Sequence, residues 1–343
     1  MKIKSKSIAC NICHSAVNIC AGAVLLMDAN APAQNLFVAD FDSGNVYEYS
    51  PGGAKSTFAS GLSSPEGLAF DSAGDLYVSE GYTDIVKITP GGAQSTFASF
   101  LNYPGELAFN SASNLFVANA GLGSITKITP GGAQSTFASG LGTSIGLAFN
   151  SAGDLFVANI NNGNITEITP GGVQSTFASG LNNPVGLAFN STGDLFVANQ
   201  GAKDIIKITP DGAQSIFASG LDYPWGLAFN SAGDLFESDG ISGNVYEFTP
   251  AGVQSTFASG LAQPTGLAFS GETLPVPEPS AGGLLAVGVT ILLVIRHKYL
   301  RPNKSLRATR DGTFSSASRF TSFGPACLSF GVRCFMRLDN SQP

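Results

Sequence analysis

A pattern of about 40 residues recurs six times in this chain of 343 residues. The phrase LFVA and its variants start 40, 39, 40, 40 and 40 residues apart, at Leu36, Leu76, Leu115, Leu155, Leu195 and Leu235. A second phrase, GLAF or a variant, ends at Phe70, Phe109, Phe149, Phe189, Phe229 and Phe269. A fixed period of this length indicates a repeat architecture in which every unit packs against its neighbours.

Each repeat predicts four short strands. GLAF is a short apolar strand, and the Asn-Ser-Ala-Gly-Asp that follows it is typical of a tight turn. LFVAN is apolar almost throughout, as in a strand covered on both faces. The third strand alternates, and a Thr-Pro-Gly-Gly turn leads into QSTFAS, the fourth and outermost strand. Six repeats of four strands predict an all-β fold, a six-bladed β-propeller.

The two ends of the repeat array predict how the ring closes. The array opens at Leu36 with strands two to four of a blade, and it closes at Phe269 with a lone first strand. We expect the C-terminal strand to complete the first blade, which removes two exposed sheet edges. The composition agrees, because 42 Gly, 18 Pro and only 12% charged residues are typical of short strands joined by tight turns.

Charge and reactive residues exclude several functions for residues 34–273. This region contains 5 Lys, no Arg and 20 Asp or Glu. Because it is acidic, it repels phosphate backbones, and we expect no nucleic-acid partner. It contains no His and no Cys, which excludes a disulfide framework, a Cys/His zinc cluster and a Ser-His-Asp triad. The cysteines all lie in the flanks, at Cys10, Cys13, Cys20, Cys327 and Cys334.

The N-terminal segment has the layout of a secretory signal peptide. Lys2, Lys4 and Lys6 precede a mostly apolar stretch, and Ala31-Pro32-Ala33 offers a small-x-small cleavage site. We therefore expect residues 1–33 to be a signal peptide and residues 34–273 to fold outside the cytoplasm, in the cell envelope or the extracellular space.

The repeat resembles the NHL and SMP-30/gluconolactonase-like six-bladed propellers across about residues 35–270. The matching pattern is P-x-G-L-A-F-x-S-x-G-D-L-F-V-A-N, as in residues 184–199. Propellers of the streptogramin lyase type are also similar, but their chemistry relies on a histidine, which residues 34–273 lack.

The lactonase-like members hold a divalent metal with acidic and amide side chains at the channel mouth, some of them at the x of P-x-G. In this chain the second repeat reads Pro104-Gly105-Glu106, and the other x positions are Glu66, Ile145, Val185, Trp225 and Thr265. Among these residues only Glu66 and Glu106 carry a metal-binding group. This departure counts against lactonase activity.

Residues 274–303 resemble a PEP-CTERM sorting signal with a short transmembrane helix. Pro277-Glu278-Pro279 precedes the apolar segment from Ala281 to Ile295, and basic residues follow it. Fifteen helical residues span about 22 Å, less than a hydrocarbon core of about 30 Å. The resemblance implies transient membrane attachment and cleavage by an exosortase-type protease; an ordinary C-terminal anchor is the alternative. We expect the basic tail, residues 304–343, to be disordered.

Polar acceptors end the second strand of every repeat, at Asp40, Glu80, Asn119, Asn159, Asn199 and Asp239. A ring of these groups near one channel mouth would accept a hard cation such as calcium, or sugar hydroxyls. The candidate metal ligands are Asp40, Glu80, Asp239 and Glu66, and the three asparagines are candidate ligand-binding residues. No other cofactor is expected. The alternative is that Asp and Asn at strand ends bond to nearby backbone.

Aromatic residues mark two of the connections between repeats. Tyr103 and Glu106 lie at the GLAF strand that ends at Phe109, and Asp222, Tyr223 and Trp225 lie at the one that ends at Phe229, three repeats further along. Blades three apart face each other across the channel, so these residues predict opposed aromatic platforms for a carbohydrate or peptide ligand. Aromatics that only cover blade edges are the alternative.

These observations favour an exported module of the cell surface or extracellular matrix that binds polysaccharide or protein, or has a structural role, without catalysis. Nearly identical blades support this hypothesis, because an enzyme on such a scaffold needs asymmetry at the channel mouth. The alternatives are a metal-dependent SMP-30/gluconolactonase-like hydrolase that uses Glu66, Glu106 and the acceptor ring, and a spacer without a ligand.

Overall fold

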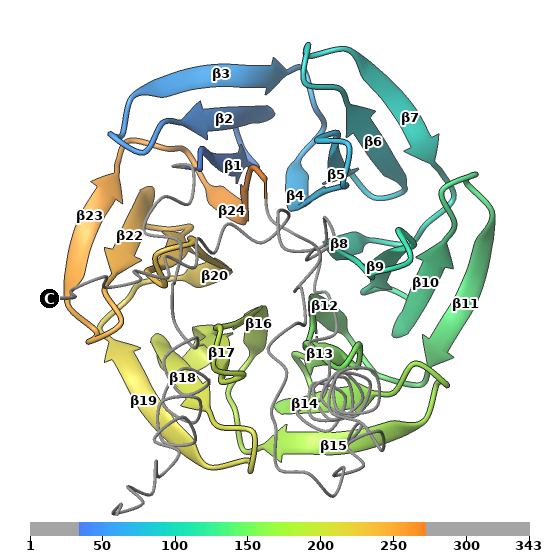
Figure 1. Cartoon of the computed structure of the whole chain (residues 1–343), viewed down its shortest axis with the longest axis vertical. Coiled ribbons are helices and arrows are strands. Elements are labelled where there is room, and N and C mark those ends of the chain that lie inside the picture. The colour runs from blue at the N-terminus through green and yellow to red at the C-terminus, as the bar shows by residue number, and fades with distance from the viewer. Residues whose placement is uncertain (1–33, 272–343) are drawn as a thin grey trace, which may run out of the picture. The chain divides into compact units, whose positions relative to one another are not determined.

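The computed structural model describes residues 34–271, which form six four-stranded antiparallel sheets around a central axis (Figure 1). This arrangement confirms the predicted all-β, six-bladed propeller. The predicted signal peptide, sorting signal with its transmembrane helix, and basic tail lie outside the described residues. Within residues 34–271 no helix is long and apolar enough to cross a membrane.

The innermost strand of each blade contains the GLAF phrase or its variant, and it begins two residues before that phrase. These strands are β4 (Pro65–Phe70), β8 (Pro104–Phe109), β12 (Ser144–Phe149), β16 (Pro184–Phe189), β20 (Pro224–Phe229) and β24 (Pro264–Phe269). The second strands are β1 (Leu36–Asp40), β5 (Leu76–Glu80), β9 (Leu115–Asn119), β13 (Leu155–Asn159), β17 (Leu195–Asn199) and β21 (Leu235–Asp239). Almost every residue of the second strands is buried, as their apolar sequence predicts.

The two outer strands of each blade are more exposed. The third strands are β2 (Asn45–Tyr49), β6 (Asp84–Ile88), β10 (Ser124–Ile128), β14 (Asn164–Ile168), β18 (Asp204–Ile208) and β22 (Asn244–Phe248). The outermost strands are β3 (Lys55–Ser60), β7 (Gln94–Ala98), β11 (Gln134–Ser139), β15 (Gln174–Ser179), β19 (Gln214–Ser219) and β23 (Gln254–Ala258). A short 3₁₀ turn, η1 (Gln200–Ala202), follows β17.

The ring closes between the two ends of the described chain. β24 pairs antiparallel with β1, with Leu36 opposite Phe269, and the first blade has the order β24-β1-β2-β3. The Ser270 amide donates to the Asn35 carbonyl oxygen at 2.9 Å, and the Asn35 amide donates to Ser270 Oγ at 3.1 Å. The expected completion of the first blade by the C-terminal strand is confirmed. We number the blades 1 to 6 from this blade.

The core consists of six apolar clusters, one between each pair of neighbouring blades. Between blades 4 and 5, for example, Phe156 of β13 packs with Leu195 and Val197 of β17. The Phe156 ring meets the rings of Phe177 and Phe189 edge-to-face, with centroids 4.9 Å apart in both pairs. Because similar aromatic groups recur around the ring, the phenylalanine in each repeat serves blade-to-blade packing.

The innermost strands approach one another through glycine. A methyl group built on Gly146 of β12 would overlap the carbonyl oxygen of Val185 on β16, and one built on Gly186 would overlap that of Trp225. Only a residue without a side chain allows backbones to come this close. The glycine of GLAF therefore sets the narrow packing of the ring around the channel.

The propeller has two faces that differ in their loops. We call the face where the innermost strands begin the connector face, because the blade-to-blade connections lie there together with the loops between second and third strands. The opposite face, where the innermost strands end in hairpins, is the hairpin face. Asp40, at the end of β1, pairs with Pro264, at the start of β24, so the acceptors at the ends of the second strands lie at the connector face.

Candidate functional site

The six acceptors at the ends of the second strands form hydrogen bonds within the propeller. Asp239 accepts from the amides of Asp222 at 2.7 Å and Tyr223 at 3.2 Å, which belong to the connection into blade 6. Asp40 accepts in the same way from the amides of Ala262 and Gln263, both at 2.9 Å. These part-buried contacts give the backbone donors of the two connections a partner within the protein.

The remaining four acceptors serve the same connections. Glu80 accepts from the Ser63 amide at 2.6 Å, and Asn199 accepts from the Asn182 amide at 2.6 Å. Asn119 is 3.4 Å from the Asn102 amide. Asn159 accepts from Ser144 Oγ at 2.9 Å, where blade 4 has serine in place of the usual proline. Five of the six side chains accept from backbone amides, as the alternative interpretation describes, whereas Asn159 accepts from a side-chain hydroxyl.

The metal hypothesis for Asp40, Glu80, Asp239 and Glu66 stays a prediction. Within residues 34–271 no group of three or more His, Cys, Asp or Glu side chains is placed to hold a metal ion. Asp40 and Asp239 are both buried and accept amide hydrogen bonds in their own blades.

The hydrogen bonds of Asp239 lead to a stability prediction. Replacing Asp239 by alanine leaves the amides of Asp222 and Tyr223 without an acceptor, so we expect a loss of about 2 kcal/mol in the free energy of unfolding. Asparagine, the residue of three other blades, keeps one acceptor oxygen and should cost less than about 1 kcal/mol. Urea unfolding of both variants measures the difference. The contrary result is that the two variants lose the same free energy of unfolding, with calcium stabilising the unsubstituted protein but neither variant. That result would contradict a backbone-binding role for Asp239 and indicate a bound metal.

The predicted aromatic residues lie on opposite blades, as Figure 1 shows for β8 and β20. Tyr223 stacks on Trp225, with centroids 5.7 Å apart and planes inclined by 26°. Tyr103 contacts a residue that the sequence analysis did not single out, Tyr82, edge-to-face at 4.8 Å. Asp222 is exposed and lies 3.7 Å from Lys203 Nζ. The two aromatic groups are therefore separate clusters.

Phe100 is a further exposed aromatic residue that the sequence analysis missed. Its side chain is 98% exposed, and its φ of 64° lies in the left-handed region. The other five repeats have glycine at this position, at Gly61, Gly140, Gly180, Gly220 and Gly260, all with φ between 76° and 82°. A bulky residue in this conformation is strained by about 1–2 kcal/mol. The sequence signal for Phe100 was the replacement of the glycine that the other five repeats have at this position.

Three neighbouring loops of the connector face carry exposed apolar side chains. The Tyr103 amide donates to the Tyr82 carbonyl oxygen at 2.9 Å, and the Ala120 amide donates to the Tyr103 carbonyl oxygen at 3.0 Å. These loops carry Tyr82, Phe100, Tyr103 and Leu122, which are 62%, 98%, 55% and 65% exposed. We call these four residues the connector-face patch. It lies over the junction of blades 2 and 3.

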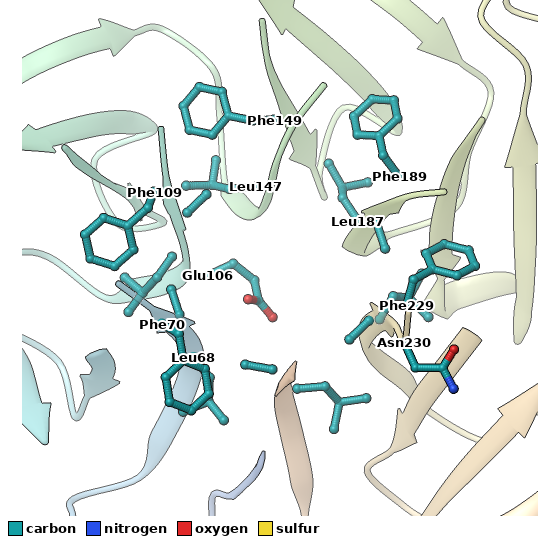
Figure 2. A pocket seen from close by; sticks show the side chains of 18 of the residues that line it. Leu68, Phe70, Glu106, Phe109, Leu147, Phe149, Leu187, Phe189, Phe229 and Asn230 are labelled. Carbon is teal, nitrogen blue, oxygen red and sulfur yellow. The ribbon is translucent and has the colours of Figure 1, made fainter. Parts of the chain in front are cut away.

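A cavity of about 950 Å³ opens on the hairpin face, lined by all six innermost strands. Figure 2 shows Leu68, Leu147 and Leu187 on its wall and the phenylalanines that end the innermost strands around it. Glu106 points into this cavity (Figure 2). Among the described lining residues it is the only ionisable one.

Glu66 and Glu106 come from the adjacent strands β4 and β8, and both are partly buried. Burial raises the pKa of Glu66 to about 7. Burial, with a smaller contribution from the negative charge of Glu66, raises the pKa of Glu106 to about 8. Glu66 therefore lies close enough to Glu106 for its charge to act on it, and at neutral pH Glu106 holds a proton for most of the time.

Blade 6 contains a buried carboxyl group without a hydrogen-bond partner. Glu237 of β21 is 0% exposed and stands where β1, β5, β9, β13 and β17 have valine. Burial raises the pKa of Glu237 well above the ordinary 4.5, and the negative charge of the nearby Asp239 raises it further. Neither carboxyl oxygen has a hydrogen-bond partner among the described residues. The Trp225 Nε1 donor is also buried and unpaired.

Comparisons with known proteins show a shared fold. No protein-family model and no curated protein matches the sequence. A propeller from the crystal structure of a nidogen/laminin complex superposes with a TM-score of 0.64 and 19% identity, covering 69% of this chain and 98% of that chain. The likeness is one of fold.

Two lyases share the same fold. A streptogramin B lyase superposes with a TM-score of 0.56 and 15% identity, covering 69% of this chain and 86% of the lyase. A catalytically inactive virginiamycin B lyase from Staphylococcus aureus with quinupristin gives a TM-score of 0.54 and 14% identity, covering 69% and 92% of the two chains. Binding proteins and enzymes thus both occur among the similar propellers.

Proposed function

We propose that this propeller is an exported, non-catalytic binding module of the cell surface or extracellular matrix, and that its connector-face patch holds the partner. The observation that carries the proposal is Phe100, a fully exposed aromatic residue at a strained backbone position that glycine occupies in every other blade. Strain that the fold does not need is often retained for function. The predicted signal peptide and sorting signal support export.

The chemistry of the patch favours a protein over a polysaccharide. Phe100 and Leu122 offer no hydrogen-bonding group to sugar hydroxyls, whereas exposed aromatic and aliphatic side chains on neighbouring loops are typical of protein interfaces. The nidogen/laminin complex is a precedent for protein binding by a similar propeller. Polysaccharide is the second partner class, for which the stacked Tyr223 and Trp225 are the better candidates.

Replacing Phe100 by glycine tests this proposal. We expect partner binding to weaken at least about tenfold, because hot-spot aromatics contribute about 2 kcal/mol or more. The free energy of unfolding should not fall and should rise by up to about 1 kcal/mol, because glycine adopts this φ without strain. Thermal unfolding and retention of the full chain on isolated cell-surface material measure both effects.

Ile216 provides the matched control. It is 67% exposed on β19, where the other blades have threonine, and it lies outside the connector-face patch. Ile216→Thr should bind as the unsubstituted chain does. Retention that survives protease treatment of the surface material but not periodate oxidation would indicate a polysaccharide, and no retention would indicate a spacer.

The metal-dependent hydrolase is the second candidate, favoured by the closeness of Glu66 and Glu106 beside the channel. Metal-dependent turnover of lactones, lost in Glu66→Gln, would support it over the binding module. The lyase reaction is disfavoured, because the inactive lyase carries a histidine-to-alanine replacement and residues 34–271 contain no histidine.

A further inference from the structure

The hairpin-face cavity combines an apolar wall with one carboxyl group. Its wall consists of leucine, alanine and phenylalanine from the innermost strands, and its rim is polar, with Gln34, Asn230, Ser231 and Ser270. A concave apolar recess with few polar groups is the usual form of a small-molecule site, because the wall supplies affinity and the polar groups fix orientation.

Glu106 breaks the repeat pattern, because the other five innermost strands have glycine at its position. The register pairs Leu107 with Val117 and Pro104 with Asn119, so Glu106 stands where the other innermost strands have glycine, at Gly67, Gly146, Gly186, Gly226 and Gly266. Those glycines pack against a neighbouring backbone. The Glu106 side chain instead points into the cavity (Figure 2).

We propose that the hairpin-face cavity binds amphiphilic cations, molecules with an apolar body and one primary ammonium group, and that the Glu106 carboxylate is the counter-charge. Charge complementarity selects this class of ligand. Residues 34–271 contain 5 Lys and no Arg, and none of them lines the cavity, so no described cation neutralises Glu106. A bound ammonium group would also relieve the repulsion between Glu106 and Glu66.

The surroundings of Glu106 predict that binding releases a proton. The strands that pack against β8 are β4, β5, β9 and β12. Their ionisable residues are Glu66 on β4, and Tyr77 and Glu80 on β5. Tyr77 donates to Asp71 at 3.3 Å and Glu80 accepts from the Ser63 amide, so Glu66 is the group that acts on Glu106. An ammonium ion must displace the proton that Glu106 holds at neutral pH.

Calorimetric titration of the full chain with hexylammonium, compared with hexanol, tests the proposal. We expect hexylammonium to bind and to release up to one proton, measured in two buffers of different ionisation enthalpy at pH 7. Its affinity should rise by up to about tenfold per pH unit between pH 6 and 8. Hexanol has the same apolar chain without the charge and should show neither proton release nor this pH dependence.

Two variants separate charge from fold. Glu106→Gln keeps the size of the side chain, and it should lose at least about tenfold in hexylammonium affinity while hexanol binding is unchanged. Glu66→Gln should retain binding and move the pH dependence to lower pH, because one source of the raised pKa is gone. Hexylammonium binding that Glu106→Gln does not weaken, or binding without proton release, would overturn the proposal, as would no binding to the unsubstituted chain.

This inference does not depend on the connector-face patch. The cavity and the patch lie on opposite faces and share no residue. Phe100→Gly should therefore leave hexylammonium binding unchanged, and Glu106→Gln should leave retention on cell-surface material unchanged. Failure of one proposal is distinguishable from failure of the other.

Discussion

Replacing Glu237 by valine is expected to raise the free energy of unfolding by about 3 kcal/mol at pH 7. Glu237 is fully buried in β21, neither of its oxygens has a hydrogen-bond partner, and the other five blades have valine at this position. A buried polar group without a partner retains its full desolvation cost, whereas valine packs against the apolar side chains around it.

The pH dependence of stability should change in the same variant. Because burial raises the folded pKa of Glu237 well above 4.5, the folded protein holds a proton that the unfolded chain has released. The stabilisation from this proton is fully present below about pH 4.5 and is lost, at about 1.4 kcal/mol per pH unit, as the pH rises towards the folded pKa. Glu66 and Glu106 act in the same direction, so Glu237→Val should lower the slope by one proton without abolishing it.

Urea unfolding at pH 5, 6, 7 and 8 measures both effects. The reverse substitution, Val197→Glu in blade 5, is the matched control, because Val197 is 0% exposed at the equivalent position of β17. It should destabilise the protein by a similar amount. If Glu237→Val were no more stable than the unsubstituted protein at pH 7, Glu237 would have a buried partner, such as a water molecule or cation, that satisfies it.

Replacing Gly146 by alanine should destabilise the propeller by about 3 kcal/mol or more. The new methyl group would overlap the carbonyl oxygen of Val185 on the next innermost strand, and it would also meet Ala158 at 3.2 Å. The Val185 backbone on one side and the Ala158 Cβ on the other leave no flexible side-chain end to move aside, so the ring must widen locally. The expected result is a lower unfolding midpoint, or failure to fold, measured by circular dichroism.

Gly140 supplies the control for this prediction. Its φ is 78° and nothing lies within 4 Å of an added methyl group, so alanine there meets backbone strain but no clash. Gly140→Ala should cost about 1 kcal/mol. Equal losses at the two positions would show that conformational strain, and not the close approach of the innermost strands, determines the effect.

The sequence predicts the fold well because the pattern and the packing have the same period. A 40-residue repeat that cannot bury its own apolar strands must stack on copies of itself, and the lone strand ending at Phe269 has no partner other than β1. The apolar second strands predict burial on both faces, which is what β9, β13 and β17 show.

The candidate site was harder to predict, because the direction of a side chain depends on neighbouring loops. The position of Asp239 in the repeat is clear from the sequence, but its hydrogen bonds to the Asp222 and Tyr223 amides depend on how the connection returns to the blade. Phe100 and Glu237 were missed because the shared repeat pattern predicts the fold, whereas these two residues each occur in one repeat only. In both cases the signal was a single break in the consensus, glycine to phenylalanine and valine to glutamate.

The hydrogen bonds between Asn35 and Ser270 determine how the propeller can be displayed. Both residues lie at the hairpin face, so the polypeptide enters and leaves the ring at the same place on blade 1. A tether joined to either flank would hold the propeller by this side. The connector face would then point away from the point of attachment, with Phe100 and its neighbours free to meet an approaching partner.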